Sequence, residues 1–247
     1  MVNKIFAKFF EFFGYYFAIG FLKTHNKFIR EELTFNLIKE HSLEQQKKSY
    51  EHFRPYFSDA LIFETVEEIR KHSILESSKN NNFEKNNKEF LKLEFGVFKG
   101  VSTNFISKFI SNGKLYAFDS FKGLSEDWIG FSKAAGSFSN NGIVPDLNSN
   151  VEVIQGDIYK TLEIFLKKKN SKINFIHLDL DTYPVTKFVL EKTKPYLTPE
   201  CVILFDELHN FFGWENGAYK ALNEIYKTDE YNFLSFTKFE QAAIKIK

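Results

Sequence analysis

The stretch Leu-Lys-Leu-Glu-Phe-Gly-Val-Phe-Lys-Gly-Val-Ser, residues 91–102, decides the fold of this chain. The apolar residues at 90–94 predict a buried strand, and helical spacing resumes after Gly96 and Gly100. A strand, a glycine turn and a helix in this order direct backbone N–H groups and a helix N-terminus at a ligand. The acid before the glycines, Glu94, suits a ligand with a positive amino group better than one that presents only phosphates. An ordinary tight turn of an α/β protein is the alternative interpretation.

Composition limits the class of protein. The 247 residues are enough for one α/β domain with an appendage, and 43% of them are hydrophobic. With 33 basic and 32 acidic residues the net charge is +1, so the basic excess of a nucleic-acid-binding protein is lacking. We therefore expect no nucleic-acid partner. The single cysteine, Cys201, excludes an intramolecular disulfide and fits a reducing compartment, which predicts a cytoplasmic protein.

The N-terminal residues 5–22 are rich in aromatic and aliphatic side chains. No cleavage pattern of a signal peptide follows them. The segment is barely long enough to span a bilayer, and the charged residues Lys8 and Glu11 interrupt it. We expect an amphipathic helix that packs on the core or on a second subunit of a homodimer. Attachment in the plane of a membrane surface is the alternative.

A domain boundary is expected near residue 88. Apolar residues recur at intervals of three and four over 24–76, which predicts helices, and residues 77–88 are polar and low in complexity. We therefore expect a helical cap or oligomerisation region at 1–88 and a catalytic core at 89–247. In the core, apolar runs alternate with helical patterns. The seven predicted strands lie at 90–94, 114–118, 151–154, 173–178, 201–205, 232–236 and 242–246.

This alternation predicts a Rossmann-like, doubly wound sheet of seven strands, mostly parallel, with an antiparallel hairpin at its C-terminal end. Acids follow the predicted parallel strands, and the carboxyl ends of such strands meet at one edge. These acids are Glu94, Asp119, Asp157, Asp179, Asp181, Asp206 and Glu207. Each by itself could be a helix N-cap, but acids after five successive strands favour a site.

The first acids fit S-adenosylmethionine. Asp119 follows the glycine turn by about 20 residues, the usual spacing of an acid that binds ribose hydroxyls. Only Gly96 and Gly100 are present, so the glycine pattern of dinucleotide-binding dehydrogenases is absent. The sulfonium, amino and ribose groups of S-adenosylmethionine are well matched by carboxylates. The predicted cofactor-binding residues are Glu94, Gly96, Gly100, Ser102, Asp119, Ser120, Asp157 and Asp179.

The later acids predict a divalent metal ion, with Mg²⁺ as the expected ion. Asp181, Asp206 and Glu207 supply the hard oxygen ligands that Mg²⁺ accepts. Such an ion would hold a substrate hydroxyl and lower its pKa, so that the oxygen can attack the methyl group. Binding of water or lysine is the alternative role for these acids. His177 and His209 flank these acids, and both are candidates to take the proton. His177, within a strand, is expected to be a core histidine, and His209 is the better candidate base beside a catalytic Asp181.

Four stretches carry a family resemblance: residues 93–102, then Phe-Asp-Ser-Phe-Lys-Gly-Leu-Ser-Glu-Asp-Trp at 118–128, His-Leu-Asp-Leu-Asp-Thr-Tyr at 177–183, and Phe-Asp-Glu-Leu-His-Asn-Phe-Phe-Gly-Trp at 205–214. Together they resemble class I S-adenosylmethionine-dependent methyltransferases, and among them the macrocin O-methyltransferase (TylF-like) family. The resemblance implies a sugar hydroxyl as acceptor and a divalent metal. It places the metal on Asp181, Asp206 and Glu207 and the ribose on Asp119. Asp157 departs from the aromatic residue that close relatives carry.

The expected function is therefore a cytoplasmic O-methyltransferase of a sugar hydroxyl, either on a nucleotide-sugar or on a capsule or surface-glycan precursor. A non-sugar small molecule, an amine or a phenol, is an alternative acceptor. An RNA methyltransferase would need a basic stripe, and a non-catalytic binding protein would be expected to lose the acids.

Overall fold

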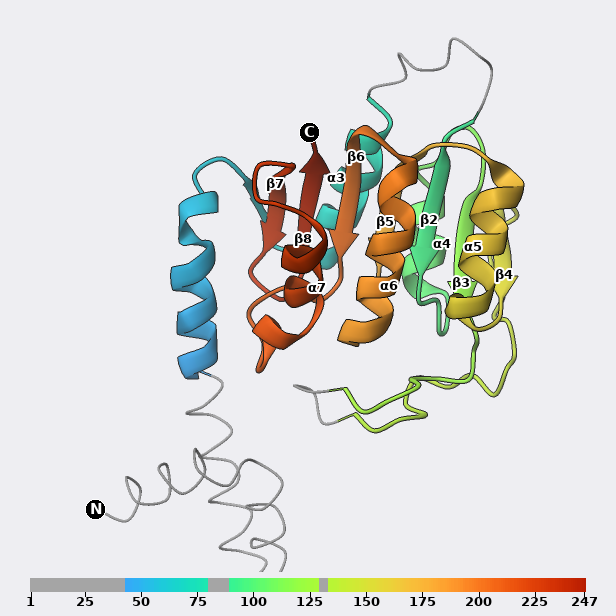
Figure 1. Ribbon diagram of the computed structural model, residues 1–247, viewed down its shortest axis with the longest axis horizontal. Helices are drawn as coiled ribbons and strands as arrows, with labels where there is room; N and C mark the ends of the chain where they lie inside the picture. The colour runs from blue at the N-terminus through green and yellow to red at the C-terminus, as the bar shows by residue number, and fades with distance from the viewer. Residues whose placement is uncertain (1–42, 80–88, 129–132) are drawn as a thin grey trace, which may run out of the picture. The chain divides into compact units, whose positions relative to one another are not determined.

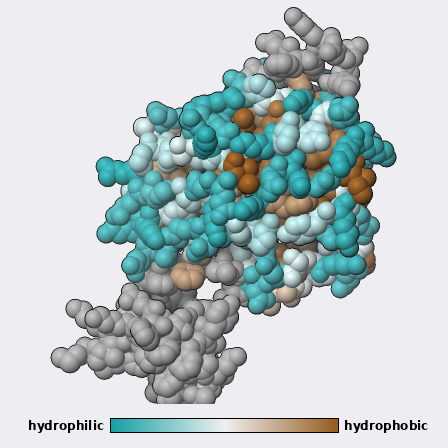
Figure 2. Space-filling view, viewed as in Figure 1, coloured by the Kyte–Doolittle hydropathy of each residue, from teal (hydrophilic) through white to brown (hydrophobic). Residues whose placement is uncertain are grey.

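The computed structural model describes residues 43–79, 89–128 and 133–247. The chain separates into two compact units, Met1–Glu44 and Gln45–Lys247, and the fold described below is that of the second unit. The helix predicted at 5–22, with its alternative of membrane attachment, lies outside the described residues. Across the part of the chain that is described, no helix is both long and apolar enough to cross a bilayer. The face seen in Figure 2 is mainly hydrophilic, with a few apolar patches.

An eight-stranded sheet forms the centre of this unit (Figure 1), with the strand order β1-β7-β8-β6-β5-β2-β3-β4. The strands are β1 Leu61–Phe63, β2 Leu91–Phe95, β3 Leu115–Asp119, β4 Val151–Gln155, β5 Ile173–Leu178, β6 Leu197–Phe205, β7 Tyr231–Thr237 and β8 Ala242–Ile246. Strand β8 pairs antiparallel with β6 and β7, and the other pairs are parallel. All strands of this sheet except β8 therefore end at the same edge.

Helices cover both faces of the sheet (Figure 1). Helices α3 Val66–Ser77 and α4 Val101–Ser107 lie on one face, and α5 Ile158–Lys169, α6 Tyr183–Thr193 and α7 Ala218–Ile225 lie on the other. Residues 43–53 are helical and lead into the 3₁₀ helix η1 Arg54–Tyr56, while η3 Lys194–Tyr196 and η4 Trp214–Asn216 are further 3₁₀ turns. Each face of the sheet thus has its own apolar core.

Alternation along the strands decides which side chains face which helices. In β6, Leu204 packs on the α3–α4 side and Phe205 on the opposite side. Asp206 comes two residues after Leu204 and falls on the α3–α4 side with it. His177 pairs in register with Leu204 on one side and with Glu94 on the other. Glu94, His177 and Asp206 therefore form a row across three adjacent strands, facing α3 and α4.

The predicted fold class is confirmed, but the sheet has eight strands where seven were predicted. The additional strand is β1, which pairs with β7 through Leu61 opposite Ser235, in a region predicted to be helical. Its three residues are too few to show an alternating pattern. Helix α3 packs on the sheet through Ile69 and Ile74. The unit that contains the sheet therefore begins well before the boundary predicted at residue 88.

Gly96 is required by the close approach of two chain segments. It follows β2 with a φ of 89°, in the left-handed region that favours glycine. A Cβ atom there would lie 1.8 Å from the backbone oxygen of Asp179, which follows β5. The Asp179 N–H also donates to the Phe95 oxygen at 2.9 Å. A side chain at position 96 would therefore push apart the ends of β2 and β5.

We expect Gly96→Ala to lower the free energy of unfolding by about 3 kcal/mol, through left-handed strain and overpacking together. Urea denaturation measures this loss. Gly136→Ala is the matched control, because Gly136 also has a positive φ, 83°, yet a Cβ there would meet nothing within 4 Å. Equal losses in the two variants would contradict the proposed clash.

Candidate active site

Strands β2 and β5 are neighbours at the point where the order of the sheet reverses: β3 and β4 continue on one side, and β6 continues on the other. In open α/β sheets, ligands bind beyond the carboxyl ends of the strands at such a point. The backbone contact between Phe95 and Asp179 brings the segments after these two strands together. Most of the predicted site residues lie on these segments or at the end of the next strand on either side.

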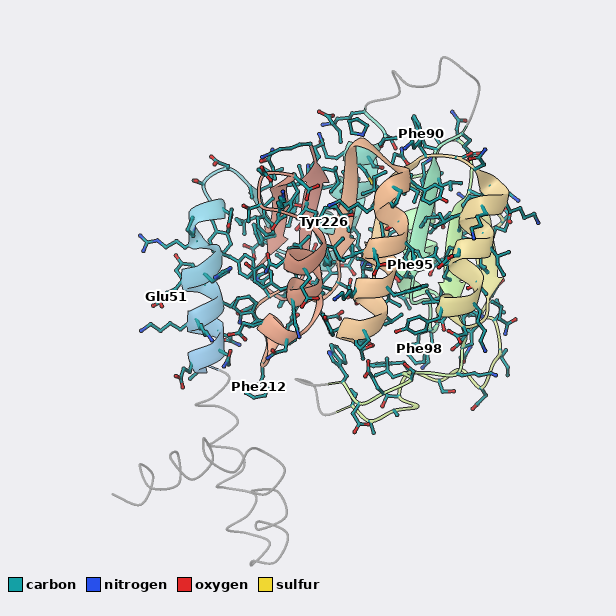
Figure 3. The ribbon with its side chains drawn as sticks, viewed as in Figure 1. Glu51, Phe90, Phe95, Phe98, Phe212 and Tyr226 are labelled. Carbon is teal, nitrogen blue, oxygen red and sulfur yellow. The ribbon has the colours of Figure 1, made fainter. Side chains whose placement is uncertain are left out.

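Asp119, the last residue of β3, holds the turn after β2. Its Oδ2 accepts from the N–H groups of Val97 at 2.7 Å and Phe98 at 2.8 Å, and its Oδ1 accepts from the Phe121 N–H at 2.7 Å. Figure 3 shows Phe98 at the edge of the sheet opposite Phe90, which precedes β2. A carboxylate has about four acceptor sites, so these three bonds leave one for a ligand hydroxyl. Asp119 thus has the position predicted for a ribose-binding acid and also shapes the turn.

Glu94 is buried at the end of β2 with one oxygen bonded and one unpaired. Its Oε1 accepts from the Ser102 hydroxyl at 2.8 Å and lies 3.0 Å from Nδ1 of His177. Its Oε2 is buried without a hydrogen-bond partner among the described residues. A buried acceptor left unpaired is costly, so Oε2 marks a place for a donor from a ligand. An amino group beside this oxygen would supply that donor.

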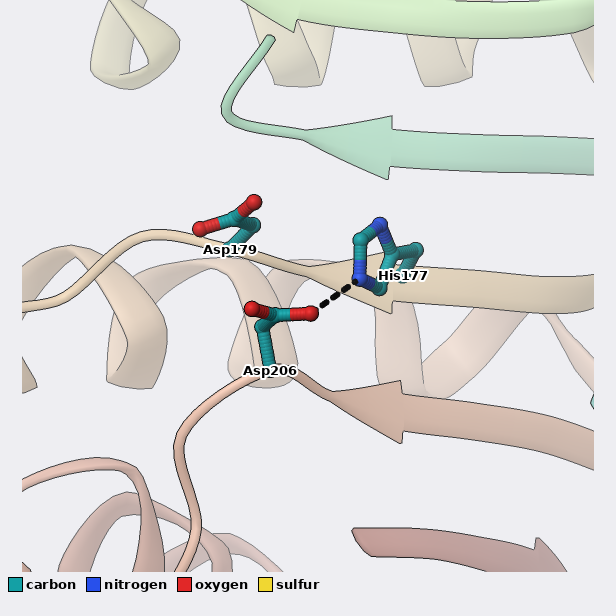
Figure 4. Close-up of side chains that lie close together, drawn as sticks. All are labelled: His177, Asp179 and Asp206. Carbon is teal, nitrogen blue, oxygen red and sulfur yellow. Dashed lines mark hydrogen bonds and ion pairs between the residues drawn. The ribbon is translucent and has the colours of Figure 1, made fainter. Parts of the chain in front are cut away.

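His177 links the two halves of the site. Its Nε2 lies 3.3 Å from Oδ1 of Asp206 (Figure 4), and its Nδ1 lies 3.0 Å from Oε1 of Glu94. The same Oδ1 accepts from a terminal nitrogen of Arg70 on α3 at 2.6 Å. Four charged side chains from β2, β5, the end of β6 and α3 therefore form one continuous chain of contacts, Glu94–His177–Asp206–Arg70.

These contacts decide the protonation states of His177 and Asp206. Burial lowers the pKa of His177, but its hydrogen bonds to Asp206 and Glu94 outweigh burial and raise that pKa to about 9. Burial raises the pKa of Asp206, but the hydrogen bond from His177 and the charge of Arg70 lower it overall to about 2. At neutral pH, His177 is therefore a cation and Asp206 a carboxylate.

Three further acids form a second group. Asp179, Asp181 and Glu207 each offer a ligand atom, and these atoms lie within 4.8 Å of one another. Burial, followed by the charge of Asp206, raises the pKa of all three carboxyls, that of Asp181 to about 7. A divalent cation would relieve this repulsion, and carboxylate oxygens are the ligands that Mg²⁺ prefers. The residues present fit the predicted ion.

The grouping of the acids differs from the predicted one. Asp179 was assigned to the cofactor, but it lies with Asp181 and Glu207. Asp206 was assigned to the metal, and its Oδ1 is already occupied by Arg70 and His177. Any contact of Asp206 with an ion therefore falls to its second oxygen.

Two predicted cofactor residues have local structural roles. Asp157 caps helix α5 by accepting from the Tyr159 N–H at 3.0 Å, which is the capping role that the sequence left open. The Ser120 hydroxyl oxygen accepts from the Lys122 N–H at 3.1 Å. Among the described contacts, none joins Asp157 or Ser120 to the acids at the ends of β5 and β6.

The candidate base His209 requires correction. Its side chain is buried, its Nε2 lies 3.2 Å from the backbone oxygen of Gln241, and its ring packs against Phe53 and Phe236. Burial lowers its pKa to about 4. The backbone N–H groups of Leu208 and His209 approach the Glu240 oxygen, which turns this loop toward β8. His209 is therefore a core residue, and we no longer assign it the role of base.

The roles of two charged residues were not predicted. His177 was expected to be a core histidine in preference to a base, yet it links Glu94 and Asp206. Arg70 lies in a segment predicted to be helical and separate from the core. No local pattern marks an arginine that will reach an acid 136 residues later. For His177, its position between two acid-bearing strands was the available signal.

Comparison with known proteins places this site in a family context. Residues 93–208 match a family model described as a methyltransferase domain. Residues 93–208 are therefore similar to a methyltransferase domain. The matched region includes all seven acids that follow the strands, from Glu94 to Glu207. No curated protein matches the chain.

Solved structures share the fold of the methyltransferase domain. CalS11, a calicheamicin methyltransferase, is 20% identical with a TM-score of 0.56, over 90% of this chain and 94% of its own. The O-methyltransferase NovP is 14% identical with a TM-score of 0.52, over 73% and 79%. An apo structure of CalS11, named there a TDP-rhamnose 3'-O-methyltransferase, is 20% identical with a TM-score of 0.49, over 72% and 76%. The predicted Rossmann-like fold is confirmed, and the family match supports the predicted methyltransferase.

The raised pKa of Asp181 predicts a pH-dependent stability. Its folded-state pKa of about 7 lies above the ordinary value of 3.8, so the folded protein binds this proton more tightly than the unfolded chain. The contribution is complete below pH 3.8 and is lost as the pH rises through about 7. We expect the metal-free protein to lose more stability over this range than Asp181→Asn does, as measured by urea denaturation.

Asp229→Asn serves as the control, because Asp229 is an exposed acid that precedes β7. Its pH dependence should parallel that of the wild type. Parallel curves for the wild type and Asp181→Asn would show that Asp181 is not perturbed.

Proposed function

We propose that this protein is a cytoplasmic, S-adenosylmethionine-dependent O-methyltransferase. Its proposed acceptor is a sugar hydroxyl, on a nucleotide-sugar or on a capsule or surface-glycan precursor. One observation carries the proposal: within the methyltransferase domain, the turn held by Asp119 and the acids that follow β5 and β6 lie at the same edge of the sheet. The methyl donor and the sugar hydroxyl can therefore meet at this edge.

The methyl donor, S-adenosylmethionine, would bind along β2 and β3. The unpaired Oε2 of Glu94 suits the amino group of the methionine part, and the remaining acceptor site of Asp119 suits a ribose hydroxyl. Gly96 keeps the backbone between these acids free of a side chain. The resemblance of residues 93–102 to the cofactor turn of class I methyltransferases supports the same placement.

A divalent ion, with Mg²⁺ as the proposed species, would be held by Asp179, Asp181 and Glu207, whose ligand atoms lie together. Asp206, which forms a second such group with His177 and Asp179, would contribute its second oxygen. When bound, it supplies a positive charge that orients the acceptor hydroxyl and lowers the pKa of that hydroxyl. The raised pKa values of the three acids support this proposal, because burial and the charge of Asp206 disfavour ionisation of these carboxyls, and a cation would restore it.

We assign Asp181 as the group that accepts the proton of the sugar hydroxyl. It is half-buried at the edge of the sheet, where an acceptor can approach, whereas His209 is buried in the core. In the transfer, a bond forms between the acceptor oxygen and the methyl carbon while the carbon–sulfur bond breaks. The sulfonium becomes a neutral thioether, and the hydroxyl proton moves to the Asp181 carboxylate.

Two observations favour a sugar as the acceptor. The stretches at 118–128, 177–183 and 205–214 resemble the macrocin O-methyltransferase family, whose acceptor is a sugar hydroxyl. CalS11, which has the same fold over 90% of this chain, is named a TDP-rhamnose 3'-O-methyltransferase. We extend the proposal to a homodimer in which residues 1–88 contribute to subunit contacts.

The donor site can be tested by binding alone. We expect Asp119→Ala to weaken S-adenosylhomocysteine binding at least tenfold in titration calorimetry, because a charged acceptor for a ribose hydroxyl is lost and the turn is released. Asp229→Ala, which removes an exposed acid that precedes β7, should bind like the wild type. Equal affinity of Asp119→Ala and the wild type would remove Asp119 from the donor site.

The acceptor and the ion can be tested by activity. A panel of nucleotide-sugars, phenols and amines, assayed with methyl-labelled S-adenosylmethionine, should show transfer to a nucleotide-sugar. The activity should be lost in EDTA, return with Mg²⁺, and fall at least tenfold in Asp206→Asn. Activity that survives EDTA would remove the ion from the mechanism. Transfer only to a phenol or an amine would overturn the sugar acceptor.

A further inference from the structure

Arg70 belongs to the site although it lies outside the methyltransferase domain at 93–208. It is on α3, and one terminal nitrogen donates to Oδ1 of Asp206 at 2.6 Å. The side chains of both residues are only 12% exposed. A largely buried arginine–carboxylate contact is short and strongly oriented. This ion pair is buried, in contrast to exposed lysine–acid pairs elsewhere on this chain, such as Lys47 with Glu51.

Local structure holds α3 in place for this contact. Thr65 caps the helix in a capping box with Glu68, which fixes where the helix begins. Ile69 and Ile74 are fully buried against α4 and the sheet. Arg70 follows Ile69 directly and reaches Asp206, the residue after β6. The helix therefore positions the guanidinium through its apolar contacts, independently of any ligand.

The contact fixes the rotation of the Asp206 carboxylate. Arg70 and His177 both approach the same oxygen, Oδ1, at 2.6 and 3.3 Å. Figure 4 shows the other oxygen of Asp206 on the side away from His177. Two donors on one oxygen leave the second oxygen of this acid available as an acceptor. Glu207, which follows Asp206 in sequence, belongs to the acid group with Asp179 and Asp181.

We infer that Arg70 is a positioning residue for the divalent ion: it clamps Oδ1 of Asp206 so that Oδ2 is presented to an ion held by Asp179, Asp181 and Glu207. This inference rests on the proposed function, since it requires that an ion binds. Residues that hold a metal-ligating carboxylate contribute to metal affinity through the ligand, and their loss typically lowers that affinity 10- to 100-fold. Helix α3 thereby becomes part of the active site.

The test measures the ion directly. Binding of Mn²⁺ to the full-length, metal-free protein is followed by electron paramagnetic resonance. Neither S-adenosylmethionine nor a sugar acceptor is added. We expect Arg70→Met to weaken Mn²⁺ binding at least tenfold, and Arg70→Lys to weaken it severalfold, because a lysine ammonium lacks the planar fork of arginine. Asp206→Asn should weaken binding at least as much as Arg70→Met, which assigns the signal to this site.

Lys71→Met is the matched control. Lys71 is the next residue of α3 and is exposed, so its substitution removes the same charge from the same helix without touching Asp206. It should bind Mn²⁺ like the wild type. Thermal melting verifies that each variant is folded, and if Arg70→Met does not fold, Arg70→Lys decides.

The outcomes separate this inference from the proposed function. A wild-type protein that binds no Mn²⁺ overturns the ion and the role of Arg70 together. A wild type that binds Mn²⁺, with equal or tighter binding by a folded Arg70→Met or, failing that, by Arg70→Lys, overturns the role of Arg70 alone. An equal loss in Lys71→Met would assign the effect to the charge of α3 and would also overturn the clamp.

Discussion

Carboxylates buried at the end of a parallel sheet must be matched by positive charge, because an isolated buried charge is strongly disfavoured. In this protein the match is made inside the fold by Glu94, His177, Asp206 and Arg70, which touch in that order. Removing one partner of a buried ion pair typically costs about 3–5 kcal/mol. The chain of charges therefore ties β2, β5, the end of β6 and helix α3 to one another, and it does so at the edge where the donor and the acceptor would meet.

Some carboxylate oxygens of the site have no positively charged partner in the described part of the fold, and these indicate where ligands would bind. Glu94 keeps one buried oxygen without a partner among the described residues. Asp179, Asp181 and Glu207 crowd together with raised pKa values. The amino group of a methyl donor would supply positive charge to Glu94, and a divalent ion would supply it to the three acids. This charge distribution would thus favour binding of both ligands.

The acids could be predicted from the sequence because they follow apolar strands, and the glycine turn because Gly96 and Gly100 interrupt the pattern. The roles of these residues were less predictable. Asp157 resembled a ligand but caps a helix, and His209 resembled a base but packs between aromatic rings. Position in the sequence identifies which residues reach the edge of the sheet. It does not say whether a side chain then points toward solvent, toward a helix terminus or into the core.

The sequence by itself determined the order of strands and helices, the parallel sheet and the edge at which the acids gather, since these follow from periodicity and from the residues that end each strand. Only the tertiary structure decided how the acids are grouped and which cations they meet. Strand β1 is too short for a pattern and exists because β7 offers it a pairing edge. Arg70 reaches Asp206 because α3 packs on the face to which β6 turns that side chain. Such contacts depend on the packing of segments far apart in the chain, which no local pattern records.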